Sequence, residues 1–157
     1  MQKEEVLKNL VHDMEQFLDE HRDLEFYVLA LDCNAEYATF LVCMNTLEDF
    51  ARTLKQYQTK YEKYTNEKWI RELRYNPGDW EYTDISEVNL FEEEELVAKY
   101  QDDIDRQCGE VMSLCNEILR DFSQTEVFGR IPKTPDFISF CIDHDEDVEG
   151  ALERQMH

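Results

Sequence analysis

The sequence is poor in glycine, in proline and in long apolar runs. Its 157 residues include only four glycines and three prolines, and the glycines lie far apart. The chain therefore has no glycine-rich loop of the kind that wraps phosphate groups. No apolar stretch approaches the roughly 20 residues that span a bilayer, and the opening MQKEEVLKNL lacks the apolar core of a signal peptide. These absences predict a cytoplasmic protein.

Positive charge is also scarce, because 16 Lys and Arg residues stand against 37 Asp and Glu residues, giving a net charge of −21. Such a chain repels the phosphates of nucleic acids and anionic membrane surfaces, so we expect neither as a partner. Two interpretations of the charge stay open: it keeps the protein soluble, or it speeds the encounter with a basic partner.

Cysteine chemistry is limited as well. The five cysteines, Cys33, Cys43, Cys108, Cys115 and Cys141, are odd in number, lack CxxC spacing and lie in apolar segments, which predicts buried free thiols. No two histidines have the four-residue spacing of a helical zinc site. The sequence therefore predicts no metal and no cofactor.

The first half of the chain alternates between helical and strand patterns. Apolar residues at three- and four-residue spacing predict an amphipathic helix from Gln2 to about His21. Residues 25–32 and 36–44 predict an antiparallel hairpin with its turn at residues 33–35. Thr46, followed three residues later by Asp49, is typical of a helix start, and the helix is expected to reach about residue 64.

The second half begins with a heptad pattern, in which Leu90, Val97, Ile104, Val111 and Ile118 recur every seven residues. This predicts one long helix that lies across the sheet or bends around the core, weakened in its middle by a glycine, with its acidic first turns matching the helix dipole. A homodimer through the heptad stripe is the alternative.

The last part contains an alternating strand at residues 135–143 and a helix that Asp147 caps. Together the elements predict a single α+β domain over residues 1–157. Its sheet is small and mainly antiparallel, with about four strands, of which the last pairs with the hairpin, and amphipathic helices cover it.

The stretch RYNPGDW, residues 74–80, allows two local structures. A type II turn would use Pro77 at its second position and a positive φ at Gly78. A helix cap would place Asn76 at the N-cap and Pro77 in the first turn. The sequence alone leaves both open for residues 76–79.

The block Leu73–Tyr82 resembles the "leucine, arginine, tyrosine, small polar, proline, any, acidic, tryptophan, any, tyrosine" motif of the domain-of-unknown-function family 4303. Glu25-Phe26-Tyr27, Asn45-Thr46 and Phe128-Gly129 agree as well, so the resemblance covers most of the chain, although Gly78 departs from the motif. The resemblance implies an α+β bacterial cytosolic protein. The family carries no established activity, so no catalytic residues transfer.

We expect a non-enzymatic, acidic protein-binding module, by analogy of size and composition with immunity proteins that inhibit a basic partner. Acidic residues gather between residues 81 and 105, and aromatic residues of the motif serve either as binding anchors or as a clamp onto the sheet. The predicted partner-binding residues are Tyr75, Trp80, Tyr82, Glu92, Glu93, Glu94 and Glu95.

The alternative is an unrecognised enzyme with a site near the end of the late strand, at Asp143, His144 and Asp145. It predicts a concave pocket there and a titrating group with a perturbed pKa. A calcium loop beginning at Asp143 is excluded, because Val148 and Arg154 occupy its glycine and acidic positions. The sequence predicts a monomer or a homodimer.

Overall fold

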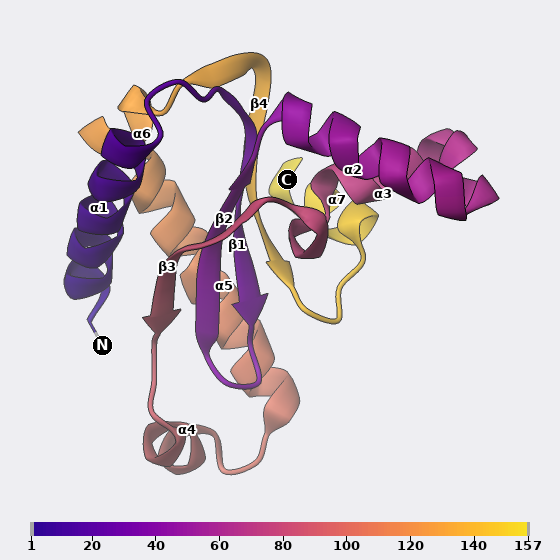
Figure 1. Cartoon of the computed structure of the whole chain (residues 1–157). Helices are drawn as coiled ribbons and strands as arrows, with labels where there is room; N and C mark the ends of the chain where they lie inside the picture. Colours follow the sequence, from indigo (N-terminus) through magenta and orange to yellow (C-terminus); the bar gives the residue numbers. More distant parts are fainter. Residues whose placement is uncertain (1, 157) are drawn as a thin grey trace.

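The computed structural model describes residues 2–156, and side chains as far as residue 155. Its centre is a four-stranded sheet in the order β3-β2-β1-β4 (Figure 1). Strand β1 (Phe26–Asn34) is antiparallel to β2 (Thr39–Asn45), β2 is antiparallel to β3 (Tyr82–Asn89), and β1 is parallel to β4 (Lys133–Asp143). The predicted α+β fold with a small, mainly antiparallel sheet is confirmed.

Helices cover both faces of this sheet (Figure 1). One face carries α1 (Lys3–Glu20), α5 (Ile104–Ser123) and α6 (Glu126–Arg130), and the other carries α2 (Leu47–Lys60), α3 (Glu67–Tyr75) and α7 (Val148–Met156). The short 3-10 helices η1 (Glu62–Thr65) and η2 (Pro77–Asp79) flank α3, and α4 (Glu93–Tyr100) lies beyond the hairpin end. In the described part, no helix has the length and apolar character to cross a membrane.

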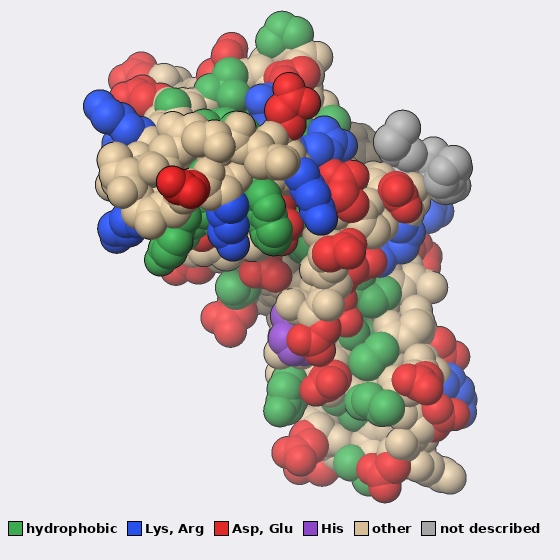
Figure 2. Space-filling view, turned by 90° about the vertical axis from the view of Figure 1, so that its right-hand side faces the viewer, with side chains coloured by type: hydrophobic (Ala, Val, Ile, Leu, Met, Phe, Trp, Pro, Cys, Tyr) green, Lys and Arg blue, Asp and Glu red, His purple; other side chains and the backbone are tan. Residues whose placement is uncertain are grey.

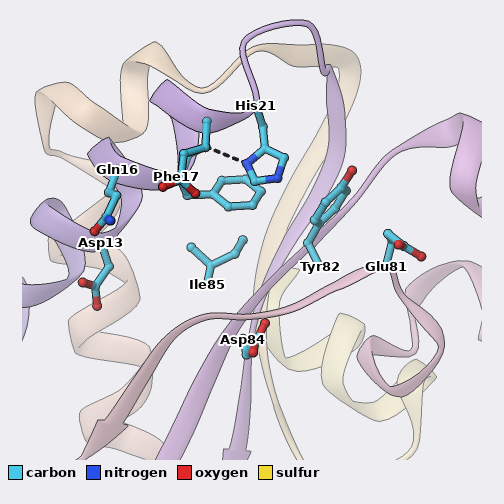
Figure 3. A pocket seen from close by; sticks show the side chains of 9 residues that line it. Asp13, Gln16, Phe17, His21, Glu81, Tyr82, Asp84 and Ile85 are labelled. Carbon is cyan, nitrogen blue, oxygen red and sulfur yellow. Dashed lines mark hydrogen bonds between the residues drawn. The ribbon is translucent and has the colours of Figure 1, made fainter.

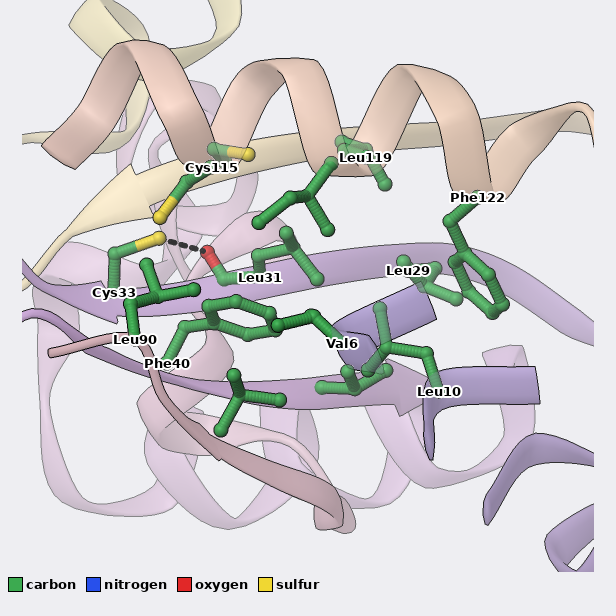
Figure 4. Packing of buried hydrophobic residues seen from close by; sticks show 14 of the residues in the cluster. Val6, Leu10, Leu29, Leu31, Cys33, Phe40, Leu90, Cys115, Leu119 and Phe122 are labelled. Carbon is green, nitrogen blue, oxygen red and sulfur yellow. Dashed lines mark hydrogen bonds between the residues drawn. The ribbon is translucent and has the colours of Figure 1, made fainter. Parts of the chain in front are cut away.

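Strand β1 supplies both hydrophobic cores because successive side chains of a strand point to opposite faces. Leu29 and Leu31 pack against α1 and α5, as Figure 4 illustrates, whereas Val28 and Ala30 belong to the core under α7. This two-sided burial explains why β1 has a nearly continuous apolar sequence.

The hairpin turn lies further along the chain than the sequence predicts. Cys33 and Asn34 belong to β1, Asn34 pairs with Thr39, and the connection covers residues 35–38. The turn closes through the N–H of Ala38, which donates to the carbonyl of Ala35 over 3.2 Å while Ala38 adopts a φ of 54°. The predicted turn at residues 33–35 is wrong because the buried Cys33 extends the strand.

The single long helix is also wrong. The chain reverses between α4 and α5, where Gln101 and Asp102 have φ values of 49° and 68°. Val97 and Ile104, on either side of this break, are 57% and 45% exposed, whereas Val111 and Ile118 are buried against the sheet. The heptad residues therefore do not form one continuous stripe, and the predicted weak point at Gly109 lies inside an unbroken α5.

Several local predictions are confirmed. Thr46 caps α2 by accepting a hydrogen bond from the N–H of Asp49 at 3.1 Å, although α2 ends at Lys60 rather than near residue 64. Asp147 accepts a hydrogen bond from the N–H of Gly150 at 2.7 Å. The five cysteines are free thiols, of which four are buried and Cys108 is half-buried.

Candidate functional site

The Leu73–Tyr82 block forms a cap, not a type II turn. The side chain of Asn76 accepts a hydrogen bond from the N–H of Gly78 at 3.1 Å, and Pro77 opens the 3-10 helix η2. No glycine in residues 2–156 has a positive φ, so Gly78 does not adopt the conformation that a type II turn requires. The cap interpretation is correct.

Hydrogen bonds fasten this block to the sheet. The carbonyl of Arg74 accepts hydrogen bonds from the Trp80 indole at 3.0 Å and from the Tyr27 hydroxyl at 2.6 Å. Asn45 on β2 donates to the Tyr27 hydroxyl at 3.1 Å and accepts from the N–H of Glu81 at 3.2 Å. Burial of the Tyr27 hydroxyl raises its pKa, so it stays a neutral donor. The block is therefore a structural clamp.

The predicted partner-binding residues lie in three separate parts of the molecule. Tyr75 and Trp80 are only 8% and 6% exposed and pack in the core under α7. Tyr82 packs on the opposite face, with its ring 5.4 Å from that of Phe17. The four glutamates, residues 92–95, lie at the start of α4.

Two of these four glutamates have a structural task. Glu92 and Glu95 form a reciprocal capping box, in which the N–H of Glu92 donates to the Glu95 carboxylate over 3.1 Å. Glu93 and Glu94 are exposed and take no part in the cap. They are the members of the acidic run that remain free to face a partner.

Residues 7–157 match a known protein family, described as a domain of unknown function (DUF4303). The chain belongs to this family. Comparison with curated proteins found no match, and comparison with solved structures found none. Because the DUF4303 description names no activity, the function has to be argued from surfaces and cavities.

The largest of the described cavities is a groove of about 510 Å³ between the hairpin turn, α4 and the start of α5. Its apolar lining comes from Tyr37, Phe91, Leu96, Val97 and Ile104. We call it the α4 groove. Tyr37 is 66% exposed, so together with Val97 and Ile104 it presents apolar surface to solvent.

The same segment that breaks the helical pattern builds this groove. The left-handed residues between α4 and α5 turn the chain back so that residues 93–97 of α4 and the start of α5 line the groove together with the hairpin turn. Gln107 of α5 then ties the hairpin turn down by donating to the carbonyls of Ala35 at 3.2 Å and Glu36 at 2.7 Å. Gln107 is 6% exposed, so these hydrogen bonds are shielded from water.

Acidic side chains line the groove beside this apolar surface. Glu36, Glu92, Glu93 and Asp102 take part in the lining, and no Lys or Arg does. Two cations adjoin the lining residues along the sequence. Lys99 is placed 5.2 Å from the centre of the Phe91 ring, and Arg106 pairs with Glu110 at 3.8 Å. Figure 2 shows acidic side chains interspersed with hydrophobic ones over the lower part of the molecule.

Sequence reasoning included Glu92 and Glu93 in the site but missed its apolar residues. Val97 and Ile104 were expected to face the core or a second copy, because the heptad pattern suggested one helix. Tyr37 was expected in a strand and lies in the turn. The sequence did contain one indication of exposure, because Tyr37, Val97 and Ile104 stand close to acidic residues in the chain.

A second, smaller cavity of about 240 Å³ lies at the ends of the parallel strands β1 and β4. It brings Asp143 and His144 together with Asp32 and with the Asn76-Pro77-Gly78 segment of the block. Asp145, the third predicted residue, does not line this strand-end pocket, and its side chain is 78% exposed. Parallel strands of open α/β sheets place ligand sites at this end.

Asp32 is the titrating group that sequence reasoning missed. Burial raises the pKa of its carboxyl above the ordinary value of 3.8, the charge of His144 lowers it, and the charge of Asp143 raises it further. The Asp143 carboxylate itself accepts hydrogen bonds from the N–H groups of Ala35 at 3.1 Å and His144 at 3.0 Å. Within the described residues, no group of three or more His, Cys, Asp or Glu side chains is arranged to hold a metal ion.

Proposed function

We propose that this DUF4303 chain is a protein-binding module whose α4 groove binds a basic, amphipathic segment of a partner protein. The observation that carries the proposal is the composition of the groove, which combines exposed apolar side chains with carboxylates and lacks Lys and Arg. A cytoplasmic location and an immunity-like inhibition of the partner belong to the same proposal. The small size and the net charge of −21 support them, by analogy with the size and composition of immunity proteins.

The two kinds of side chain have different tasks in this proposal. Val97, Ile104 and Tyr37 lose exposed apolar surface when the groove is filled, which supplies affinity at about 25 cal/mol per Å² before association costs. Glu36, Glu93 and Asp102 attract the basic residues of the partner and raise the association rate. An occupied groove therefore has an apolar centre and a charged rim, as protein interfaces commonly do.

The charge of the groove favours a different protein as the partner over a second copy of the chain. Two copies meeting through this groove would bring Glu36, Glu93 and Asp102 close to the same carboxylates of the other copy. Like charges at close range oppose association unless cations separate them. A basic partner removes that repulsion, so the proposal commits to a heterologous partner.

The test is affinity capture from an extract of the source cells. Three proteins are immobilised, the extract is applied at low salt, and the bound proteins are measured by quantitative mass spectrometry. The immobilised proteins are the wild type, the groove variant Val97→Ser/Ile104→Ser and the control Leu47→Ser/Tyr61→Ser. The control also removes two exposed apolar side chains, which are 42% and 52% exposed and lie outside the groove. We expect a basic protein on the wild-type and control columns that is lost from the groove variant.

A captured protein supports the proposal only when it then binds the purified wild type directly. Equal recovery of every basic protein on the three columns contradicts the proposal and assigns the charge to solubility. Light scattering of the purified chain tests whether a second copy of the chain fills the groove instead. A dimer of the wild type that the groove variant disrupts would identify a second copy.

A second candidate function is acid–base chemistry in the strand-end pocket. Asp32 favours it, because a half-buried carboxyl with a raised pKa is a typical general acid or base. His144 is the other titratable group that lines the pocket beside the carboxylates. The test is an assay of ester and phosphoester hydrolysis, in which Asp32→Asn abolishes activity and the exposed control Asp145→Asn retains it. If the wild type hydrolyses none of these esters and phosphoesters, the pocket does not catalyse their hydrolysis.

A further inference from the structure

A pocket of about 310 Å³ lies between the end of α1 and the edge strand β3 (Figure 3). It is separate from the α4 groove and from the strand-end pocket, because none of its lining residues belongs to either. Its volume falls at the lower end of the range for small-molecule sites, which starts at about 300 Å³. The pocket therefore has room for a small ligand or for one long side chain.

Three rings form one wall of this pocket. The rings of Phe17 and His21 stack with their centres 4.1 Å apart, and Tyr82 meets both edge to face at 5.4 Å and 5.3 Å. In Figure 3 the rings lie together above the side chain of Ile85. All three are half-buried, so each keeps surface for a ligand. Aromatic faces attract cations through their quadrupoles.

The orientation of His21 adds a hydrogen-bond acceptor to this wall. Its Nδ1 lies 2.8 Å from the carbonyl oxygen of Phe17, as the dashed line in Figure 3 marks. Because a carbonyl only accepts, Nδ1 must carry the proton of this hydrogen bond. In the neutral ring Nε2 is then an acceptor, which suits an N–H group of a ligand.

Four carboxylates, Asp13, Glu20, Glu81 and Asp84, line the same pocket, and no Lys or Arg does. Asp13 accepts a hydrogen bond from the Ser86 hydroxyl at 2.6 Å. Across residues 2–155, none of the four forms an ion pair with Lys or Arg. The charge of Arg52 reaches the Tyr82 hydroxyl, but Arg52 pairs with Asp49 at 2.8 Å, so the negative charge of the four carboxylates is not neutralised by an ion pair.

An irregularity in the sheet places the β3 side of the pocket. Val42 pairs with Ser86 and Met44 with Tyr82, so the three residues 83–85 of β3 stand opposite Cys43 alone. Bulges of this kind bend a strand and redirect its side chains, and they are frequent next to binding sites. Here the bulged stretch supplies both Asp84 and Ile85 to the pocket.

We infer that this pocket binds an organic cation through a guanidinium or primary ammonium group. The cation lies against the aromatic wall, and its N–H groups donate to carboxylates of the pocket lining, of which Glu81 and Asp84 stand on either side of Tyr82 in the sequence. Charge-assisted hydrogen bonds and cation–π contact act together on such a group. Its source is either a free amine or the side chain of an arginine or lysine in another protein. The inference does not depend on the proposed function of the α4 groove.

The test is an NMR titration of the full chain with four probes. Agmatine and spermidine represent free amines, Nα-acetyl-arginine amide represents a protein side chain, and Nα-acetyl-citrulline amide is its neutral counterpart. We expect saturable shifts of the His21 and Tyr82 ring signals with cations and none with the citrulline compound. Saturation by the free amines alone, or by the arginine amide alone, identifies the source. If no cation causes more change than the citrulline compound, the inference is wrong.

Variants then distinguish specific binding in this pocket from non-specific attraction of cations to an acidic protein. Glu81→Gln/Asp84→Asn changes two exposed carboxylates and should raise the dissociation constant of the bound cation about tenfold. Glu62→Gln/Glu67→Gln makes the same charge change at two exposed positions outside both pockets and should alter it by less than about twofold. Tyr82→Phe should retain binding, whereas Tyr82→Leu should weaken it. Equal effects of the two charge variants overturn the inference.

Discussion

The indole nitrogen of Trp80 donates a hydrogen bond to the carbonyl oxygen of Arg74 over 3.0 Å, across the 3-10 helix η2. The same oxygen accepts the Tyr27 hydroxyl, so the motif closes on itself and on the sheet at one atom. Trp80 is 6% exposed and packs edge to face on Phe140, with ring centres 6.3 Å apart. Trp80 therefore stabilises the fold from within the core and does not form part of the exposed surface.

Truncation of Trp80 should therefore lower stability. Trp80→Ala leaves a cavity in the core and should reduce the free energy of unfolding by about 3–5 kcal/mol. Trp80→Phe keeps most of the packing and loses the hydrogen bond, at a cost of about 1–2 kcal/mol. Urea unfolding measures both, and Trp69→Phe at a half-buried position is the control, expected to cost less than about 1 kcal/mol. A Trp80→Ala protein as stable as the wild type would contradict the clamp.

The break between α4 and α5 predicts that a glycine added at position 101 and a glycine removed at position 109 both raise stability. Gln101 adopts the left-handed conformation that glycine tolerates without cost, so Gln101→Gly should raise the free energy of unfolding by up to about 1 kcal/mol. Gly109 lies within α5, and an added methyl group would meet no atom within 4 Å. Gly109→Ala should therefore stabilise by about 0.5–1 kcal/mol. Thermal or urea unfolding tests both, and destabilisation by Gln101→Gly would show that the chain does not reverse there.

The raised pKa of Asp32 predicts a pH dependence of stability. The folded chain holds the Asp32 proton more tightly than the unfolded chain, whose pKa is near the ordinary 3.8. Ionisation thus destabilises the fold, and stability falls as the pH rises from 3.8 through the raised pKa. Asp32→Asn removes this loss, so the variant should exceed the wild type in stability at pH 7, with no such gain below pH 3.8.

Asp136 gives a control of opposite sign for this measurement. The Thr134 hydroxyl donates to its carboxylate at 2.7 Å, and this hydrogen bond with the charge of Arg74 lowers the pKa of Asp136. Its contribution is present above pH 3.8 and is lost as the pH falls through the lowered pKa. Asp136→Asn should accordingly be less stable than the wild type at pH 7. A gain in both variants, or in neither, would contradict the assignment for Asp32.

Local sequence patterns predicted much of this fold because they report on burial. The alternation along residues 135–143 and the apolar run of β1 determined two strands, and Thr46, Asn76 and Asp147 marked helix starts correctly. The break at Gln101 escaped prediction because neither it nor Asp102 is a glycine, the usual residue for a left-handed helix end. Regular heptad spacing continued across the break and concealed it.

The candidate sites were harder to predict because each joins distant segments. The α4 groove needs the hairpin turn, which was placed too early, and the start of α5, which was taken for the middle of a helix. The strand-end pocket combines residues near positions 32, 77 and 143. The pairing of β1 with β4 brings positions 32 and 143 together, and the hydrogen bond of Tyr27 to the carbonyl of Arg74 holds the segment near position 77 against the sheet. No single stretch of sequence specifies these long-range contacts.

The binding proposal predicts separate effects on the two rate constants for the captured partner. Glu36→Gln/Glu93→Gln should lower the association rate and weaken its dependence on salt, because these exposed carboxylates steer the encounter. Glu62→Gln/Glu67→Gln removes two exposed acids outside both pockets and is the control for net charge. Surface plasmon resonance at two ionic strengths measures both variants, and identical salt dependence would assign the attraction to overall charge.

The most direct test of the α4 groove is the dissociation constant of that purified partner for Val97→Ser/Ile104→Ser, compared with Leu47→Ser/Tyr61→Ser. Burial of the two groove side chains predicts a loss of about ten- to a hundredfold in affinity, mainly through faster dissociation, while the control stays within about threefold of the wild type. Unchanged affinity of the groove variant, with both variants folded, would contradict the account.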